Sequence, residues 1–135
     1  IRVNEISAGA SIVSAYSKVR TYLVAQQREM AKEGGVILDG RDIGTVVLPN
    51  AQLKIYQVAS IECRALRRHN ENLSRGLNSD LDEIKREVAA RDKADMTREI
   101  SPLKKADDAI EIDTSDMTID EVVAHIMNLV EKKTQ

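Results

Sequence analysis

Residues 35–45 read GVILDGRDIGT, an apolar run that stops abruptly in two aspartates, an arginine and two glycines. Continuously apolar runs such as Val36–Leu38 are typical of buried strands in parallel sheets. Ligands of open α/β sheets bind beyond the carboxyl ends of the strands, where the Asp-Gly-Arg-Asp segment would lie. Charges placed there cost desolvation and add nothing to a core, so we expect them to recognise a ligand. Glycine would allow close backbone approach, Arg41 would bind an anion, and Asp42 would accept from a donor edge.

The remaining chain alternates predicted strands and helices. Strands are expected at 53–59 and 109–113, and helices at 17–34, 60–75, 78–98 and from Thr118 onward. Ser17 and Ser60 can cap two of these helices, and Thr118 forms a capping box with Glu121. The alternation predicts an α/β fold with a mostly parallel sheet and flanking helices. Three strands make a thin sheet for such a fold, so we expect something to be missing.

Composition narrows the classes of partner. The chain has 135 residues, 42% of them hydrophobic, which is enough for one domain with a core. A net charge of −2 and 2% aromatic residues argue against nucleic-acid binding. No apolar run approaches membrane-spanning length, so no membrane partner is expected. A single cysteine, Cys63, allows no intramolecular disulfide, which fits a reducing cytosol and a cytoplasmic location.

Arginines recur at helical spacing in the helix predicted after Ser60. Arg64, Arg67 and Arg68 stand at i, i+3 and i+4, opposite apolar residues. One interpretation is a solvated basic face with ion pairs. The other is a phosphate clamp, because the guanidinium group binds phosphate oxygens in a fixed geometry.

The next predicted helix changes character along a single face. Its apolar stripe of Leu81, Ile84 and Val88 continues as three charged residues, which are Arg91, Asp95 and Arg98. Asp95 is within reach of both arginines by i−4 and i+3 spacing, so the three can hold one another in place. The alternatives are a salt-bridged helix end in solvent and a ligand pocket lined by Arg-Asp-Arg. The two histidines, His69 and His125, are too few and too far apart to predict a metal site.

These segments together resemble the C-terminal portion of bacterial cytidylate kinases, the CMP/dCMP kinases. The resemblance covers essentially the whole chain and rests on five segments in the family's order: SKVR (17–20), DGRDIGTVVLP (39–49), ASIECRALRR (59–68), RDKADMTR (91–98) with SPL (101–103), and IDTS (112–115). It implies a partial P-loop nucleoside-monophosphate-kinase fold. It also implies transfer of the γ-phosphoryl group of ATP to CMP or dCMP, with Mg²⁺, in pyrimidine nucleotide metabolism.

The resemblance further implies roles for individual residues. Ser11, Arg20 and Asp42 correspond to the set that reads cytosine, with Asp42 accepting from the exocyclic amine. Arg91 and Asp95 correspond to the pair on the sugar hydroxyls, and Arg41 and Arg98 to the arginines on the monophosphate. Arg64, Arg67 and Arg68 correspond to the lid helix near the ATP phosphates. Arg41, Arg98 and Arg67 are therefore the expected catalytic arginines, since phosphoryl transfer requires positioning and charge neutralisation.

The resemblance leaves out the family's first strand and its phosphate-binding loop. No glycine in these residues is followed by Lys-Ser or Lys-Thr, as a loop of the G-x-x-x-x-G-K-[ST] type requires. We therefore expect these 135 residues alone to be inactive, and to bind neither ATP nor Mg²⁺ as the complete enzyme would. The implied domains are 1–15 as the tail of the monophosphate-binding insertion, 16–59 with 104–135 as the α/β core, and 60–103 as a lid-like helical segment.

The missing first strand would lie between the strands at 36–38 and 53–59. Exposed strand edges invite pairing, so we expect this chain either to close the gap by sliding its strands together or to fill it by association with a second copy. The complete enzyme is expected to be a monomer. Two other functions stay open from the sequence. The chain could be a non-catalytic module that binds a nucleotide or an anion, or part of another P-loop small-molecule kinase.

Overall fold

The computed structural model describes residues 9–10 and 12–134, and the chain divides into two compact units. The first unit comprises Ile1–Asn50 and Arg91–Lys105, and the second comprises Ala51–Ala90 and Ala106–Gln135. These boundaries follow spatial clustering and do not test the predicted division into insertion tail, core and lid, which stays a prediction. In the described part of the chain, no helix is long and apolar enough to cross a membrane.

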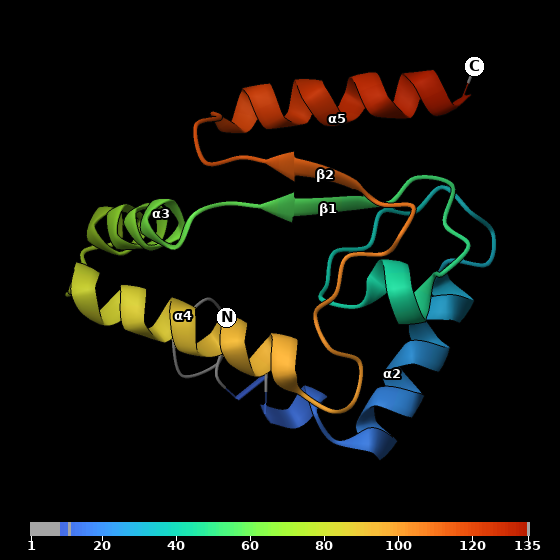
Figure 1. Ribbon diagram of the computed structural model, residues 1–135, viewed down its shortest axis with the longest axis horizontal. Coiled ribbons are helices and arrows are strands. Elements are labelled where there is room, and N and C mark those ends of the chain that lie inside the picture. The colour runs from blue at the N-terminus through green and yellow to red at the C-terminus, as the bar shows by residue number, and fades with distance from the viewer. Residues whose placement is uncertain (1–8, 11, 135) are drawn as a thin grey trace. The chain divides into compact units, whose positions relative to one another are not determined.

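The second unit contains a parallel pair of strands. Strand β1 (Ile55–Val58) pairs with β2 (Ile110–Asp113), in a register that runs from Ile55 opposite Ile110 to Val58 opposite Asp113. Helix α3 (Ile61–Ser74) follows β1 directly, and α5 (Ile119–Thr134) follows β2 (Figure 1). Ala65, Ile84 and Ile112 are buried in this unit. The strands predicted at 53–59 and 109–113 and the parallel character of the sheet are therefore confirmed, and the pairing of these two strands with each other is a finding of the structure.

Side chains satisfy the first backbone N–H groups of α3 and α4. The Cys63 N–H donates to the Ser60 hydroxyl at 3.1 Å, which confirms the predicted cap of α3. At the start of α4 (Leu81–Thr97), the Glu83 N–H donates to Asp80 Oδ1 at 2.8 Å. This backbone hydrogen bond favours the ionised carboxylate and lowers the pKa of Asp80 below its ordinary value.

Helix α5 begins with the predicted capping box. The Thr118 N–H donates to Glu121 Oε2 at 2.7 Å, and the Glu121 N–H donates to the Thr118 hydroxyl at 3.3 Å. The pKa of Glu121 lies below its ordinary value, first because of the backbone hydrogen bond from Thr118 and then because of the Thr118 hydroxyl. A depressed carboxylate pKa stabilises the fold above the unfolded-state pKa, and this stabilisation is lost as the pH falls through the folded-state pKa.

The Thr118→Ala variant should lower the free energy of unfolding by about 1 kcal/mol at pH 7, the usual cost of losing an N-cap hydroxyl. Part of this difference should disappear in acid, because protonated Glu121 no longer gains from its capping contacts. Urea unfolding followed by circular dichroism from pH 7 to about pH 3.5 measures it. Thr21→Ala is the control, since that hydroxyl donates to the Ser17 carbonyl within a helix and caps no helix. An equal loss for both variants would contradict the prediction.

The first unit contains α2 (Ser17–Met30), the end of α4 and one short π-helical turn, η1 (Ile43–Val47). The N-cap residue of α2 is Tyr16, with no side-chain cap, so the predicted cap by Ser17 is wrong. The helix ends at Met30 rather than at Gly34. Gly34 and Gly35 have φ values of 75° and 66°, in the left-handed region that glycine adopts without strain.

The strand predicted at 36–38 is wrong. These residues form no strand, and the Ile37 side chain is 96% exposed. A strand needs a hydrogen-bonding neighbour and cover on its faces, and an apolar run alone supplies neither. Among the described residues, only β1 and β2 are paired. Self-association through the edge of this segment stays a prediction.

Candidate nucleotide-recognition site

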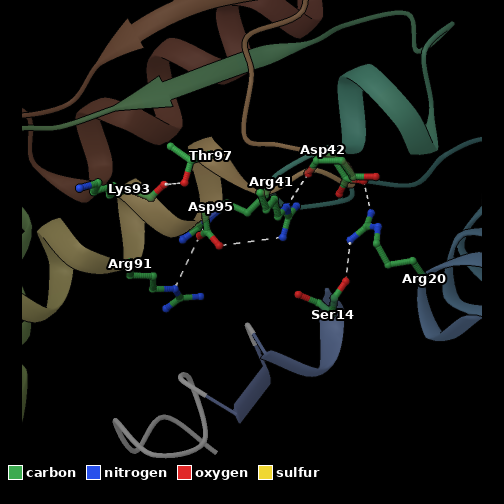
Figure 2. A network of polar contacts seen from close by, with 10 residues as sticks. Ser14, Arg20, Arg41, Asp42, Arg91, Lys93, Asp95 and Thr97 are labelled. Atoms are coloured by element: carbon green, nitrogen blue, oxygen red, sulfur yellow. Dashed lines mark hydrogen bonds and ion pairs between the residues drawn. The ribbon is translucent and has the colours of Figure 1, made fainter. Parts of the chain in front are cut away.

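Asp42 and Arg20 meet in the first unit. Asp42 precedes η1 and is only 6% exposed. Arg20, on the first turns of α2, donates from Nη2 to Asp42 Oδ2 and from Nη1 to the Ser14 carbonyl at 3.5 Å (Figure 2). A buried carboxylate needs such a partner, because an unpaired one would be strongly destabilising. The structure therefore brings together two of the three residues predicted to read the base, and Ser11 lies outside the described residues.

Asp95 is the centre of a second group of charges in the same unit. It is 3% exposed, and its Oδ2 accepts from Arg41 Nε at 3.0 Å (Figure 2). Arg91 Nε lies 3.8 Å from Oδ2, and Arg98 Nη1 lies 3.9 Å from Oδ1. The i−4 and i+3 contacts predicted along α4 are therefore confirmed. Arg41 joins them from a segment far away in the sequence, and three cations surround one carboxylate.

Two guanidinium nitrogens in this group are buried without a hydrogen-bond acceptor among the described residues. They are Arg91 Nε and Arg98 Nη2. The Arg98 side chain is 12% exposed, and its Nε donates to the Ser101 carbonyl at 2.6 Å. An unsatisfied buried donor is costly, so native proteins keep few of them without a functional reason. The arrangement provides for an additional anionic acceptor beside Arg98.

A cavity of about 190 Å³ lies between α2, η1 and the 39–42 segment. Its charged lining includes Arg20, Arg41, Asp42 and Arg98, and its apolar wall is formed by Leu23, Val24 and Ile43. The other lining residues are Ser14, Gln27, Asp39 and Gly40. Charged side chains from α2, from the 39–42 segment and from position 98 therefore converge on one cavity with an apolar wall.

Gly40 lies against the Ile43 side chain, which forms part of the apolar wall of this cavity. A Cβ atom at this position would lie 2.9 Å from Ile43 Cγ1 and 3.0 Å from its Cδ1. Any other residue would therefore displace Ile43, which lines the cavity. Since both atoms belong to the flexible end of the Ile43 side chain, the packing favours glycine here, and another residue would need this side chain to move.

The arginines of α3 contact backbone carbonyls of their own unit. Arg67 Nη2 donates to the Thr114 carbonyl and, at 3.1 Å, to the Met117 carbonyl. Arg64 Nε donates to the Ala59 carbonyl at 3.0 Å. Arg68 also has an interaction partner. Arg64 and Arg67 thus tie α3 to the loops after β1 and β2, and the predicted role of the three arginines toward ATP stays a prediction.

Two residues that make contacts in the first unit were not predicted as site residues. Arg28 donates to the carbonyls of Val46 and Val47 at the end of η1. Ser101 has a φ of 51°, which is unusual for a residue other than glycine, and its carbonyl accepts from Arg98. The only available signals were a basic residue in the last turn of a helix and the Ser-Pro dipeptide, and both are common outside functional sites.

Comparison with known proteins identifies the family. A sequence model of the family described as cytidylate kinase matches residues 1–132. The chain belongs to the cytidylate kinase family. Cytidylate kinase from Geobacillus sp. (strain WCH70) is 54% identical over 133 residues, which are 98% of this chain and 59% of that relative. Cytidylate kinase from Bacillus cereus (strain B4264) is 54% identical over 130 residues, or 96% and 58% of the two lengths.

The relative from Exiguobacterium sibiricum, also a cytidylate kinase, is 53% identical over 131 residues, with 97% of this chain and 59% of that protein covered. The chain therefore spans a little under three fifths of the length of these curated relatives. The resemblance in the sequence analysis is confirmed as family membership. The mixed α/β structure with a small parallel sheet and flanking helices is consistent with a nucleotide kinase.

The described residues do not supply a metal centre of their own. No group of three or more His, Cys, Asp or Glu side chains within them could hold a metal ion.

Proposed function

We propose that this chain carries the acceptor-nucleotide site of a (d)CMP kinase, which transfers the γ-phosphoryl group of ATP to CMP or dCMP. Family membership supports the reaction class. The observation that carries the proposal is that the Arg20–Asp42 pair and the Arg41–Asp95–Arg98 group lie in one unit, in which Arg20, Arg41, Asp42 and Arg98 line one cavity. Each part of a pyrimidine nucleotide then has a chemical counterpart in this unit.

Asp42 supplies the selection of the base. An ionised carboxylate can only accept hydrogen bonds, so it favours the exocyclic amine of cytosine and disfavours the corresponding carbonyl oxygen of uracil. Arg20 holds this carboxylate in place and keeps its charge compensated. Discrimination of this kind is effective because the wrong base leaves a buried polar group unpaired.

Arg41 and Arg98 supply the positive charge for the monophosphate, and Arg91 with Asp95 supplies hydrogen-bonding groups for the sugar hydroxyls. The unpartnered Nη2 of Arg98 supports the anion role, because a phosphate oxygen would satisfy it. Holding the acceptor phosphate among arginines reduces charge repulsion with the incoming phosphoryl group, which is most of what a protein contributes to this reaction. Arg67 is proposed to act on the ATP side.

The test is titration of CMP and UMP against the chain by isothermal calorimetry. We expect the unaltered chain to bind CMP more tightly than UMP. In Asp42→Asn the ratio of the two affinities should fall by about tenfold, because an amide replaces the charged acceptor. Asp108→Asn is the matched control, because it removes a carboxylate paired with Lys54 in the other unit. Equal affinity of the unaltered chain for CMP and UMP would overturn the base-reading role.

A non-catalytic nucleotide- or anion-binding module is the second candidate. It is supported by the unpartnered Nη2 of Arg98, because a simple anion could satisfy this donor as well as a nucleotide phosphate could. Binding of CMP and inorganic phosphate with similar affinity would favour simple anion binding. A clear advantage of CMP over phosphate, together with base discrimination, would favour the acceptor site of a CMP kinase.

A further inference from the structure

Two arginines of helix α2 bind the two ends of the segment from Asp42 to Val47. Arg20 binds the Asp42 carboxylate at the start of this segment. Arg28 donates from Nε to the Val47 carbonyl at 2.9 Å and from Nη2 to the Val46 carbonyl at 2.7 Å. The two arginines are eight positions apart on one helix, or about 12 Å along its axis. One rigid element therefore fixes both ends of a short irregular segment.

The segment between these two contacts is an unusual turn. In η1, the Val47 N–H donates to the Asp42 carbonyl at 3.2 Å, and the Leu48 N–H donates to the Ile43 carbonyl at 2.7 Å. Such i+5 bonding is rare, and single π-turns occur frequently at functional sites. Asp42 and Leu48 flank the turn with non-helical φ values of −135° and −126°. The turn cannot extend into a longer helix at either end, so its stability depends on contacts from outside.

Arg28 supplies the contact that the end of this turn lacks. The last carbonyls of any helix have no donors within the helix, and they carry its partial negative charge. The Arg28 guanidinium meets both needs with two donors and a positive charge. Val47, whose carbonyl is one of the acceptors, is 1% exposed, so water would replace the lost donor poorly there.

We infer that Arg28 is a positioning residue that holds Asp42 in its base-reading place through η1. The inference rests on the proposed role of Asp42. Because the Asp42 carbonyl accepts the N–H groups of both Val46 and Val47, a loosened turn releases the backbone of Asp42 itself. The Asp42 side chain then stays paired with Arg20 but is no longer fixed against the base. Arg28 thereby contributes to the choice of CMP over UMP from outside the lining of the cavity.

The first experiment measures the turn without any nucleotide. In Arg28→Met, amide hydrogen exchange at Val46, Val47 and Leu48 should accelerate by about tenfold, because the closed turn loses two charge-assisted hydrogen bonds. Lys32→Met is the matched control, since it removes a positive charge four positions further on, whose partner in the described part of the chain is Glu29, at 3.4 Å. Unchanged exchange in Arg28→Met would overturn the inference.

The second experiment measures the ratio of the dissociation constants for UMP and CMP. Arg28→Met should lower this ratio by about fivefold. This effect is smaller than the loss expected when a recognition group is displaced by about 1 Å, because Asp42 stays paired with Arg20. Partial unfolding would weaken the binding of both nucleotides by the same factor, so it would not change the ratio of their dissociation constants. Arg28→Lys, which keeps the charge and can donate to a carbonyl, should restore part of the preference.

The outcomes separate this inference from the proposed function. A preference for CMP that is lost in Asp42→Asn but kept in Arg28→Met would overturn the inference and leave the proposed function standing. No preference in the unaltered chain would overturn the proposed function, and with it the specificity role of Arg28. Equal weakening of CMP and UMP in Arg28→Met would also overturn the inference, because it would mean a purely structural role.

Discussion

The Asp95→Ala variant should lose about 2–3 kcal/mol of unfolding free energy, because a buried carboxylate that compensates three arginines is removed. Removing one partner of a buried ion pair usually costs more than this. Two of the three arginines, Arg41 and Arg91, have side chains about 40% and 39% exposed and can turn toward water. Arg98 is 12% exposed and cannot do so as easily. Urea unfolding at neutral pH, followed by circular dichroism, measures the loss.

Asp82→Ala is the control for this prediction. Asp82 lies on the same helix, and its Oδ1 is 3.8 Å from Lys85 Nζ, but its side chain is 80% exposed. An exposed pair of this kind contributes about 0–1 kcal/mol. If Asp82→Ala and Asp95→Ala lowered the unfolding free energy equally, Asp95 would have no special role in holding the arginines. High salt should raise the stability of Asp95→Ala relative to the unaltered chain, because added anions screen the uncompensated arginines.

The part of the site that lies on one helix could be predicted from the sequence. Residues three and four apart on a helix are neighbours, so the approach of Arg91 and Arg98 to Asp95 follows from spacing alone. The contact of Arg41 with Asp95 spans 54 positions and has no such rule. Only the family resemblance placed Arg41 and Asp95 in one site. It implied that Arg41 binds the monophosphate and that Asp95 binds the sugar hydroxyls. Their direct contact was found in the structure.

Helix starts were predicted well where a side chain caps the helix. Ser60 and Thr118 accept N–H groups as their sequence positions indicated, because capping is a local interaction. The strand at 36–38 failed for the opposite reason. Strand formation depends on a neighbour elsewhere in the chain, and local apolar character carries no information about that neighbour.

Arg28 could not be predicted as a positioning residue. Its partners are the carbonyls of Val46 and Val47, and every residue carries a carbonyl, so no side-chain pattern marks the contact. The π-turn that exposes these carbonyls likewise has no reliable sequence signature. Contacts between a side chain and a distant backbone are the class of interaction that pattern analysis misses. In this chain such contacts are inferred to position Asp42.

The Arg98→Met variant should weaken CMP binding by at least about 100-fold, because one guanidinium can donate two charge-assisted hydrogen bonds to a phosphate. Cytidine has no phosphate, so its affinity should change by less than about threefold. Calorimetric titration of both ligands measures the difference. Arg75→Met is the matched control, since this arginine pairs only with Glu71, at 2.7 Å on the surface of α3, among the contacts described. Equal weakening of CMP and cytidine would contradict the phosphate role.

Stability should respond differently from binding in the same variant. Arg98→Met loses the hydrogen bond to the Ser101 carbonyl, but it also removes the buried Nη2 that has no acceptor among the described residues. These effects oppose each other, so the unfolding free energy should change by less than about 1 kcal/mol. Asp95 keeps its contacts with Arg41 and Arg91, which compensate its charge. A side chain whose loss strongly weakens binding but leaves stability nearly unchanged is retained for its ligand, since functional groups are kept at a cost to the fold. A loss of several kcal/mol would instead show that Arg98 serves mainly to hold the end of α4.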